Sequence, residues 1–330
     1  MKKWTALGLA IIAAVLLLLL PNKPKIQYYH NQGNIFGTYY NIRYASTADL
    51  HEEIKRQLQL VDASLSMFNR ASTISRINNN ESYETDTLFE VMYQEAHAIS
   101  ELSNGAFDIT VAPLVNAWGF GTKGKTRTAD SEVKVDSIMV YVGYQKIQLT
   151  NHQIEKEDTR ITLDASAIAK GYACDVVADM LRKKGCENLL VDIGGEVVLQ
   201  GVNDKGKAWR VGISKPKTDA LGMENDLQEI IESRNLSMAT SGNYLQYYYV
   251  DGKRRSHTID PRSGYPVEHS LLSATVTASS CMRADALATA CMVIGEKEAI
   301  EMIEQTDDAA CYLMIADGDS ILIRRSKGWK

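Results

Sequence analysis

Ala284-Asp285-Ala286-Leu287-Ala288-Thr289 places a carboxylate and a hydroxyl four residues apart within a run of small and apolar residues. On a helix, residues with this spacing lie on one face. Carboxylate and hydroxyl oxygens are hard donors, the type of ligand that Mg²⁺ prefers. The same spacing is also common on solvated helix surfaces and near helix caps. The stretch therefore predicts a helix, and a metal site only if a second stretch supports it.

A second stretch, Leu163 to Tyr172, gives that support, because it places Asp164 and Lys170 six residues apart at the start of another predicted helix. Backbone N–H groups at a helix start can bind phosphate. Asp164 could instead simply cap this helix. Gly171 is costly inside a helix and indicates close packing or the approach of a ligand. Together the two stretches predict a metal-assisted site for a phosphorylated ligand.

The beginning of the chain indicates where the protein works. A cationic start, Met1 to Lys3, precedes an unbroken apolar or small run from Trp4 to Leu20, which is long enough for a membrane span. No A-x-A-like cleavage site follows the run. We therefore expect an uncleaved inner-membrane anchor over residues 1–21 and a polar tether over 22–33. The body, residues 34–330, is then expected on the periplasmic side.

The composition is that of an ordinary globular body, with 330 residues in all and a net charge of -5. No basic patch interleaved with aromatic residues indicates nucleic-acid binding. The five cysteines form no C-x-x-C pair and no zinc spacing, so buried free thiols are expected, and one disulfide stays open as an alternative. The patterns G-x-S-x-G and H-E-x-x-H are absent, which leaves common hydrolase and zinc-protease functions without support.

Hydrophobic periodicity predicts helices and strands that mix without a strict βαβ order, which favours an α+β fold. Helices are expected over residues 50–65, 87–102, 167–184 and 282–294, and Gly105, Gly185 and Gly295 are placed to end the last three. Strands are expected over residues 35–44, 189–193, 209–213 and 273–278, followed by a hairpin of 311–316 with 321–325. Residues 218–232 are polar and are expected to form an excursion.

Several segments, in this order and spacing, resemble the ApbE family of FAD:protein FMN transferases. The resemblance runs from about Phe36 to Gly295 and is carried by the following segments: Phe36 to Thr38, Leu65 to Asn69, Gly105 to Asp108, Pro113 to Gly121, Asp164 to Tyr172, Asp192 to Gly195, Ala239 to Gly242, His257 to Gly264 and Ala284 to Thr289. It implies a bi-lobed, T-fold-related domain with FAD between the lobes. The family is typically exported and tethered to the membrane, as the beginning of this chain also suggests.

The resemblance implies a reaction in which FAD is cleaved, AMP leaves and FMN is attached through a phosphoester to a Thr or Ser of an acceptor protein, with Mg²⁺ assisting. It implies that Asp285, Thr289 and the backbone carbonyl of Ala167 bind the metal. Lys170 is expected to add positive charge near the diphosphate, and Asp164 to hydrogen-bond FAD. Phosphoryl transfer needs mainly positioning and charge neutralisation, which these residue types supply.

The flavin end of the site is assigned from the same resemblance. Phe68 stands where the family usually has a tyrosine and keeps a stacking face for the flavin. Phe36 stands where the family usually has a methionine and keeps an apolar contact. The remaining expected contacts are Ala106, Phe107, Asp108, His257 and Ile259. For the acceptor hydroxyl's proton, His257 is the candidate catalytic base, while Asp285 serves catalysis through the metal.

Two other functions stay open at this point. An FAD pyrophosphatase would use the same metal site, with water in place of the acceptor hydroxyl, and give FMN and AMP. A non-enzymatic extracytoplasmic flavin-binding protein would not require Asp285, Thr289 and Lys170. The expected acceptors are membrane-bound or exported redox proteins, and no nucleic-acid partner is expected.

Overall fold

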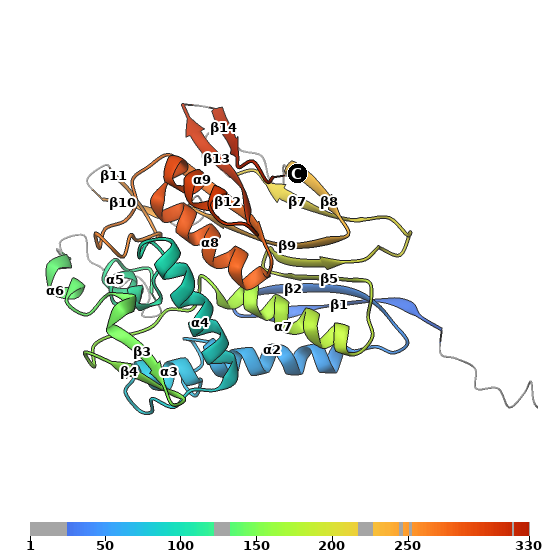
Figure 1. The fold of residues 1–330 in the computed structure, drawn as a ribbon, viewed down its shortest axis with the longest axis horizontal. Coiled ribbons are helices and arrows are strands. Elements are labelled where there is room, and N and C mark those ends of the chain that lie inside the picture. Colours follow the sequence, from blue (N-terminus) through green and yellow to red (C-terminus); the bar gives the residue numbers. More distant parts are fainter. Residues whose placement is uncertain are drawn as a thin grey trace, which may run out of the picture.

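The computed structural model describes residues 25–121, 133–216, 227–243, 247–250, 253–318 and 320–329. Its largest element is an eight-stranded sheet in which all neighbouring strands are antiparallel (Figure 1). In spatial order the strands are β1 (Gln27–Ile35), β2 (Thr38–Ser46), β5 (Leu189–Ile193), β6 (Glu196–Gln200), β9 (Asn235–Gly242), β12 (Leu271–Ala278), β13 (Ala310–Asp317) and β14 (Ser320–Arg325).

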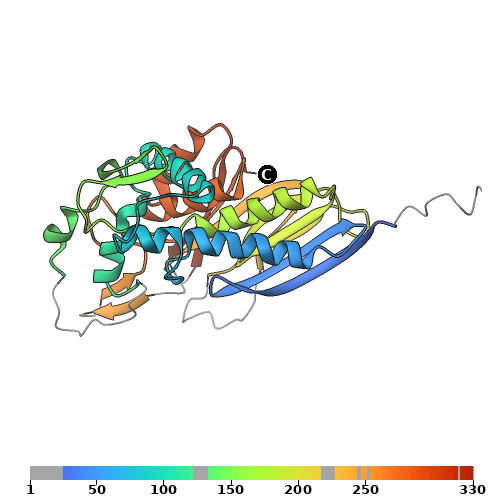
Figure 2. The same ribbon diagram turned by 90° about the horizontal axis from the view of Figure 1, so that it is seen from below.

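Helices cover one face of this sheet, as Figure 2 shows for α2 and α7. They are α2 (His51–Leu65), α4 (Thr87–Leu102), α7 (Ala169–Lys183), α8 (Cys281–Ile294) and α9 (Glu296–Glu304). Helix α8 packs against α7, α4, β9 and β12, and most of its residues are buried. Because it has almost no solvated side, its residues are apolar or small nearly all round, apart from Arg283, Asp285 and Thr289.

The opposite face of the sheet carries a hairpin of β7 (Trp209–Ser214) and β8 (Leu227–Ser233). Trp209 packs with Leu190, Val197 and Leu199 of the sheet, and Ile213 packs with β13. The remaining elements are short: α3 (Thr73–Asn78), α5 (Ala112–Ala117), α6 (Val135–Met139), β3 (Ile147–Thr150), β4 (Gln153–Lys156), β10 (Tyr247–Val250), β11 (Lys253–Ser256) and the 3₁₀ turns η1 (Ile109–Val111) and η2 (Tyr144–Lys146). α5 and α6 form a separate apolar cluster around Leu114 and Trp118, whereas α3, β3 and β4 pack their buried side chains into the main core.

The α+β class is confirmed, because helices and an antiparallel sheet form separate layers. The predicted helices α2 and α4, the strand β5 and the β13–β14 hairpin are found within one or two residues of their expected bounds. All five cysteines are free and buried, so the default expectation for them is confirmed and the disulfide alternative is wrong.

Two expectations about irregular segments were wrong. The tether expected over 22–33 ends early, because β1 begins at Gln27 and pairs with β2 along its whole length. Its pattern misleads because β1 is an edge strand with Asn31 as its single buried residue. Of the excursion expected over 218–232, residues 218–226 lie outside the described residues and 227–232 belong to β8, which has no buried residue and therefore lacks a strong apolar alternation.

The predicted anchor, residues 1–21, lies outside the described residues. In the described part of the chain, no helix is long and apolar enough to span a bilayer.

Candidate functional site

A cleft of about 1090 Å³ brings together residues of the sheet, of α7 and α8, and of the segments around Phe107, Phe120 and Ile259. It extends from the start of α7 and the inner side of α8 to β7 and the loop around Ile259. Eleven of the residues predicted for the site line it: Phe68, Ala106, Phe107, Asp108, Asp164, Ala167, Lys170, His257, Ile259, Asp285 and Thr289. Its size is at the upper end for ligand pockets, which suits a dinucleotide.

Phe36 is the predicted site residue that does not line this cleft. It occupies the two-residue turn between β1 and β2 with a φ of 52°, and its side chain packs against the main core. Its position in a tight hairpin explains the glycine that follows, since such turns require positive φ at both central residues. Its contact with a ligand stays a prediction without support from this geometry.

Gly171 lets α7 and α8 cross at very short distance. A Cβ at this position would collide with the backbone carbonyl of Cys281 and lie 2.8 Å from the Asp285 Cβ. The absence of a side chain also leaves the Gly171 N–H free to donate to Asp285 Oδ2 at 3.0 Å. Close packing, one of the two explanations considered for this glycine, is therefore what the structure contains.

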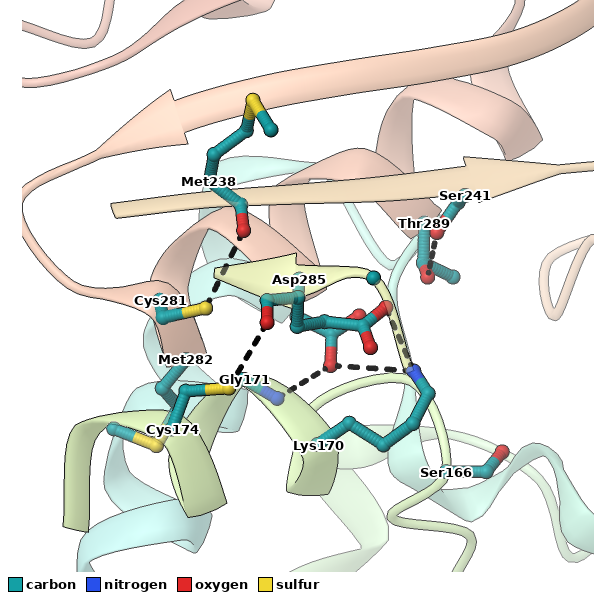
Figure 3. Close-up of polar contacts among 12 residues, drawn as sticks. Ser166, Lys170, Gly171, Cys174, Met238, Ser241, Cys281, Met282, Asp285 and Thr289 are labelled. Atoms are coloured by element: carbon teal, nitrogen blue, oxygen red, sulfur yellow. Dashed lines mark hydrogen bonds and ion pairs between the residues drawn. The ribbon is translucent and has the colours of Figure 1, made fainter. Parts of the chain in front are cut away.

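Lys170 lies between two carboxylates at the start of α7 (Figure 3). Its Nζ is 3.0 Å from Glu196 Oε1 and 3.8 Å from Asp285 Oδ2. Burial alone would lower the pKa of Lys170, but the negative charges of Asp285 and Glu196 outweigh it and hold the pKa above its ordinary value. The site thus keeps a permanent cation at the floor of the cleft.

The groups predicted to hold Mg²⁺ fit that role by their chemistry. Asp285 is almost fully buried, and Thr289 follows one turn later on the same helix, where its hydroxyl is 3.1 Å from Ser241 Oγ. The Gly171 N–H, which could have completed the first turn of α7 by donating to Ala167, bonds to Asp285 instead. Among the described residues, none donates a hydrogen bond to the Ala167 carbonyl. One carboxylate, one hydroxyl and one carbonyl are oxygen donors suited to Mg²⁺.

The described residues contain no cluster of three or more His, Cys, Asp or Glu side chains arranged for a metal ion. The predicted set does not need one, because it has a single carboxylate and relies on neutral oxygens. Such a set resembles Mg²⁺ sites that complete their coordination with substrate phosphates and water.

At the end of the cleft where the flavin is expected, Phe68 is 76% exposed although it is a large apolar residue. Ala106 and Phe107 are buried and form the wall beside it. Asp108 is also buried, and its carboxylate accepts hydrogen bonds from Thr110 and from the backbone N–H of Tyr144. Because both oxygens are already engaged, Asp108 shapes this wall, and burial raises its pKa.

Asp164 does not cap α7. Its Oδ1 accepts a hydrogen bond from the N–H of Ser166 at 2.8 Å, whereas the N-cap position of α7 is Ile168. Burial raises the pKa of Asp164. The His257 ring lies edge-on to Phe120, with ring centroids 6.3 Å apart, and Ile259 beside it is buried. Asp164, His257 and Ile259 all line the cleft.

Comparisons with known proteins agree with this geometry. The model of the ApbE family matches residues 36–313. The chain belongs to the ApbE family. It is 38% identical to an FAD:protein FMN transferase of Vibrio cholerae, over 92% of this chain and 91% of that protein. It is 35% identical to an FAD:protein FMN transferase of Escherichia coli K12, over 88% of this chain and 84% of that protein.

Solved structures of ApbE proteins share the fold. The flavin transferase ApbE from Vibrio cholerae superposes with a TM-score of 0.82 at 35% identity, covering 92% of this chain and 98% of that one. The apo form of the flavinyl transferase ApbE from Pseudomonas stutzeri gives a TM-score of 0.81 at 30% identity, covering 92% and 95%.

The sequence prediction missed Glu196, which directly follows the Gly194-Gly195 turn of this ApbE-family chain. The side chain lies on the helix-covered face of the sheet, 97% buried, and its Oε1 binds Lys170 while its Oε2 has no hydrogen-bond partner. Burial raises the pKa of Glu196 to about 7, although the Lys170 ammonium lowers it. A buried carboxylate within a strand-like apolar run is a signal that could have drawn attention to it.

Residues 119–126 read Gly-Phe-Gly-Thr-Lys-Gly-Lys-Thr, which matches the consensus of the P-loop and of the dinucleotide fingerprint. Both motifs require a preceding strand and a following helix. Here the segment follows the short helix α5, and its residues from Thr122 onward lie outside the described ones. The required context is therefore missing on its N-terminal side, and the match carries no functional assignment in this ApbE-family fold.

Proposed function

We propose that this chain is an FAD:protein FMN transferase, which moves FMN from FAD to a Thr or Ser hydroxyl of an acceptor protein and releases AMP. The observation that carries the proposal is one cleft in which the half-buried Lys170 ammonium lies beside Asp285 at one end and an exposed aromatic ring, Phe68, lies at the other. A diphosphate and a flavin ring need these two environments. The names of the relatives support the same activity.

FAD would lie between two lobes, the sheet with its covering helices and the part around α5, with its isoalloxazine ring against Phe68 and Phe107 and its diphosphate near the start of α7. An exposed aromatic face stabilises a stacked ring. The positive end of α7 and the Lys170 ammonium favour the negatively charged diphosphate. Asp164 and the loop at Ile259 would contact the remaining parts of the ligand.

Asp285, Thr289 and the Ala167 carbonyl would hold Mg²⁺. When bound, the ion polarises a phosphoryl oxygen and helps to neutralise the charge of the diphosphate. Lys170 stabilises charge that develops on the same oxygens, and its two carboxylate neighbours fix its position before the substrate arrives. In the transfer, the acceptor oxygen forms a bond to the FMN phosphorus, and the bond from that phosphorus to the oxygen bridging to AMP breaks.

His257 would accept the proton of the acceptor hydroxyl as the new P–O bond forms. An imidazole is suited to this work near neutral pH. Its place in the lining of the same cleft as Lys170 and Asp285 supports the assignment. Rates of His257→Ala measured across pH test it, and a profile with unchanged shape and height would remove the role.

Residues 1–21 would anchor the enzyme in the inner membrane and place the described domain on the periplasmic side, near exported redox proteins as acceptors. The charged start and the apolar run of the sequence support this. Protease accessibility in spheroplasts tests it, since a domain shielded from added protease until the inner membrane is broken would contradict it.

The activity itself is tested by incubating the full-length chain with FAD, Mg²⁺ and an acceptor domain that carries one exposed Thr. Intact-mass spectrometry should show the acceptor gaining one FMN, and the gain should be absent with Asp285→Ala and without metal. FMN and AMP in solution without an acceptor adduct would instead indicate a pyrophosphatase. FAD that stays intact under every condition would indicate a carrier.

A further inference from the structure

One wall of the cleft is made by β7, and every residue of this strand, Trp209 to Ser214, lines it. Successive side chains of a strand point to opposite faces. An unbroken run of lining residues therefore means that the cleft meets the strand along its edge, where N–H and C=O groups point outward. Exposure alternates along β7, with Trp209 and Ile213 buried, so neither face alone could supply this lining.

The outer edge of β7 is unpaired in the described part of the chain. β7 pairs with β8 in a two-stranded unit, and within the described residues no other backbone or side-chain group hydrogen-bonds to the backbone of Trp209 to Ser214. An open strand edge is a template for pairing with another chain, and proteins usually protect such edges. Because the unpaired edge of β7 lies inside the cleft, a segment of another chain that enters the cleft can pair with it.

Beside β7 the cleft has a polar floor on the face of the sheet away from the helices. Tyr39, Asn41 and Arg43 of β2 contribute to it, and Tyr39 and Arg43 are exposed. Arg43 and Lys205 have no ion-pair partner among the described residues. The same cleft is lined by the Gly194-Gly195 turn and by the residues assigned to FAD, which include none of these β2 and β7 residues.

We propose that the acceptor protein inserts an extended segment into this part of the cleft, where it pairs as an additional strand with the outer edge of β7. The inference rests on the proposed function, because it names the way in which that same site receives its protein substrate. Strand addition uses main-chain hydrogen bonds for affinity and so accepts segments of varied sequence. The segment's Thr or Ser then reaches the diphosphate region from the Gly194-Gly195 side.

Whether the acceptor enters this part of the cleft is tested by blocking it with a bulky label on a surface cysteine. Two matched pairs of variants are compared, Arg43→Cys with Arg56→Cys and Lys205→Cys with Lys207→Cys. Arg43 and Lys205 line the cleft, whereas the exposed Arg56 and Lys207 do not. All native thiols are buried, so a maleimide-linked polyethylene glycol chain should react at the introduced cysteine. The probe substrate is the single-Thr acceptor domain described above, and FAD affinity is measured in parallel by flavin fluorescence.

Labelled Arg43→Cys and Lys205→Cys should lose at least about tenfold in kcat/KM for the acceptor, or about 1.4 kcal/mol, while FAD affinity stays within about twofold. The labelled Arg56→Cys and Lys207→Cys controls should transfer like the wild type. Equal transfer by all four labelled variants would overturn the proposal. If the unlabelled wild type flavinylates nothing, the proposed function fails and this inference fails with it.

Hydrogen exchange tests the strand pairing itself. The wild-type chain is mixed with the acceptor domain in which the Thr is replaced by Ala, so that the complex forms without turnover. Outward amides of Trp209 to Ser214 should then exchange more slowly. If labelling in the cleft lowers transfer but the acceptor domain does not slow amide exchange along β7, the proposed pairing with this edge is overturned.

Discussion

The two ends of the cleft differ in how far they are built before a ligand arrives. At the α7–α8 end, Asp285 is 2% exposed and is already bonded to the Gly171 N–H and paired with Lys170. At the end proposed for the flavin, Phe68 is 76% exposed. The charged end is preorganised by contacts within the protein, whereas the aromatic end gains its contacts only from the ligand. Substitutions at the first end should therefore impair chemistry, and those at the second should impair mainly binding.

The largest effect is expected from Asp285→Asn. The substitution keeps the shape but removes the charge that serves the metal, Lys170 and the Gly171 N–H. The transfer rate should fall by at least about a thousandfold, or about 4 kcal/mol of activation free energy. The rate is measured by acceptor mass gain, with Asp307→Asn as an exposed control. A loss of tenfold or less would show that this end of the cleft is not where catalysis depends on charge.

Gly171→Ala should be the next most damaging change, because the added Cβ meets the Cys281 carbonyl and the Asp285 Cβ. The collision must push α7 away from α8, at a cost of about 1–3 kcal/mol in unfolding free energy. A displacement of the reacting groups by about 1 Å can cost about a hundredfold in rate. Gly185→Ala is the control, since its positive φ strains the backbone without any nearby atom. It should lower thermal stability and leave the rate unchanged.

Glu196→Gln should have a smaller effect, about tenfold in kcat or 1.4 kcal/mol, because Lys170 still has Asp285 as a partner. Burial raises the pKa of Glu196 to about 7, so its charge disappears as the pH falls through that value. The transfer rate of the wild type should therefore fall as the pH is lowered through about 7, whereas the rate of the variant should not show this fall. A pH profile of identical shape for both proteins would assign Glu196 to packing alone.

How far the sequence could lead differs between elements of the fold. The helices α2 and α4 were predictable because their apolar residues repeat with a helical period. β9 was not predicted, since it carries Ser237, Thr240 and Ser241 and reads like a loop. Those hydroxyls are present because one end of the strand borders the cleft and Ser241 faces Thr289. The polar residues at the cleft thus interrupt the apolar alternation from which β9 could have been predicted.

The site was predictable mainly through the family resemblance. Periodicity placed Asp285 and Thr289 on one helical face, yet it could not show that Lys170 would lie beside them, because that depends on how α7 crosses α8. Glu196 stayed unnoticed for the same reason, since its partner comes from a distant part of the chain. Phe36 was placed at the ligand, although the hairpin turn that holds it directs its side chain toward the core.

Phe68→Ala tests the other end of the cleft. Loss of the stacking face should raise KM for FAD by about tenfold, consistent with about 1–3 kcal/mol for stacking of a base on an aromatic side chain. kcat should hardly change, because the charged end remains intact. Since the side chain is mostly exposed, the free energy of unfolding should stay within about 0.5 kcal/mol of the wild type. Phe68→Tyr should bind FAD normally. A fall in kcat with unchanged KM for FAD in Phe68→Ala would contradict the division between the two ends.

The smallest effect on catalysis is expected at Asp175, which accepts hydrogen bonds from the Cys281 and Met282 N–H groups at the start of α8. Burial raises the pKa of Asp175 to about 6, although these two bonds lower it. The folded protein therefore favours the protonated acid, and its stability should fall as the pH rises from about 4 through 6 and then level off.

Asp175→Asn has no such titration. The unfolding free energy of the wild type relative to this variant should therefore decrease by about 2 kcal/mol between pH 4 and pH 7, since one pKa unit corresponds to about 1.4 kcal/mol and the unfolded Asp is already partly ionised at pH 4. Chemical denaturation at several pH values measures the difference. The transfer rate of the folded variant should stay near that of the wild type, because Asp175 supports α8 from outside the cleft. If the stability difference between wild type and variant does not change with pH, the two N–H groups keep the Asp175 carboxylate charged in the folded protein. The start of α8 is then as preorganised for negative charge as the α7 end of the cleft.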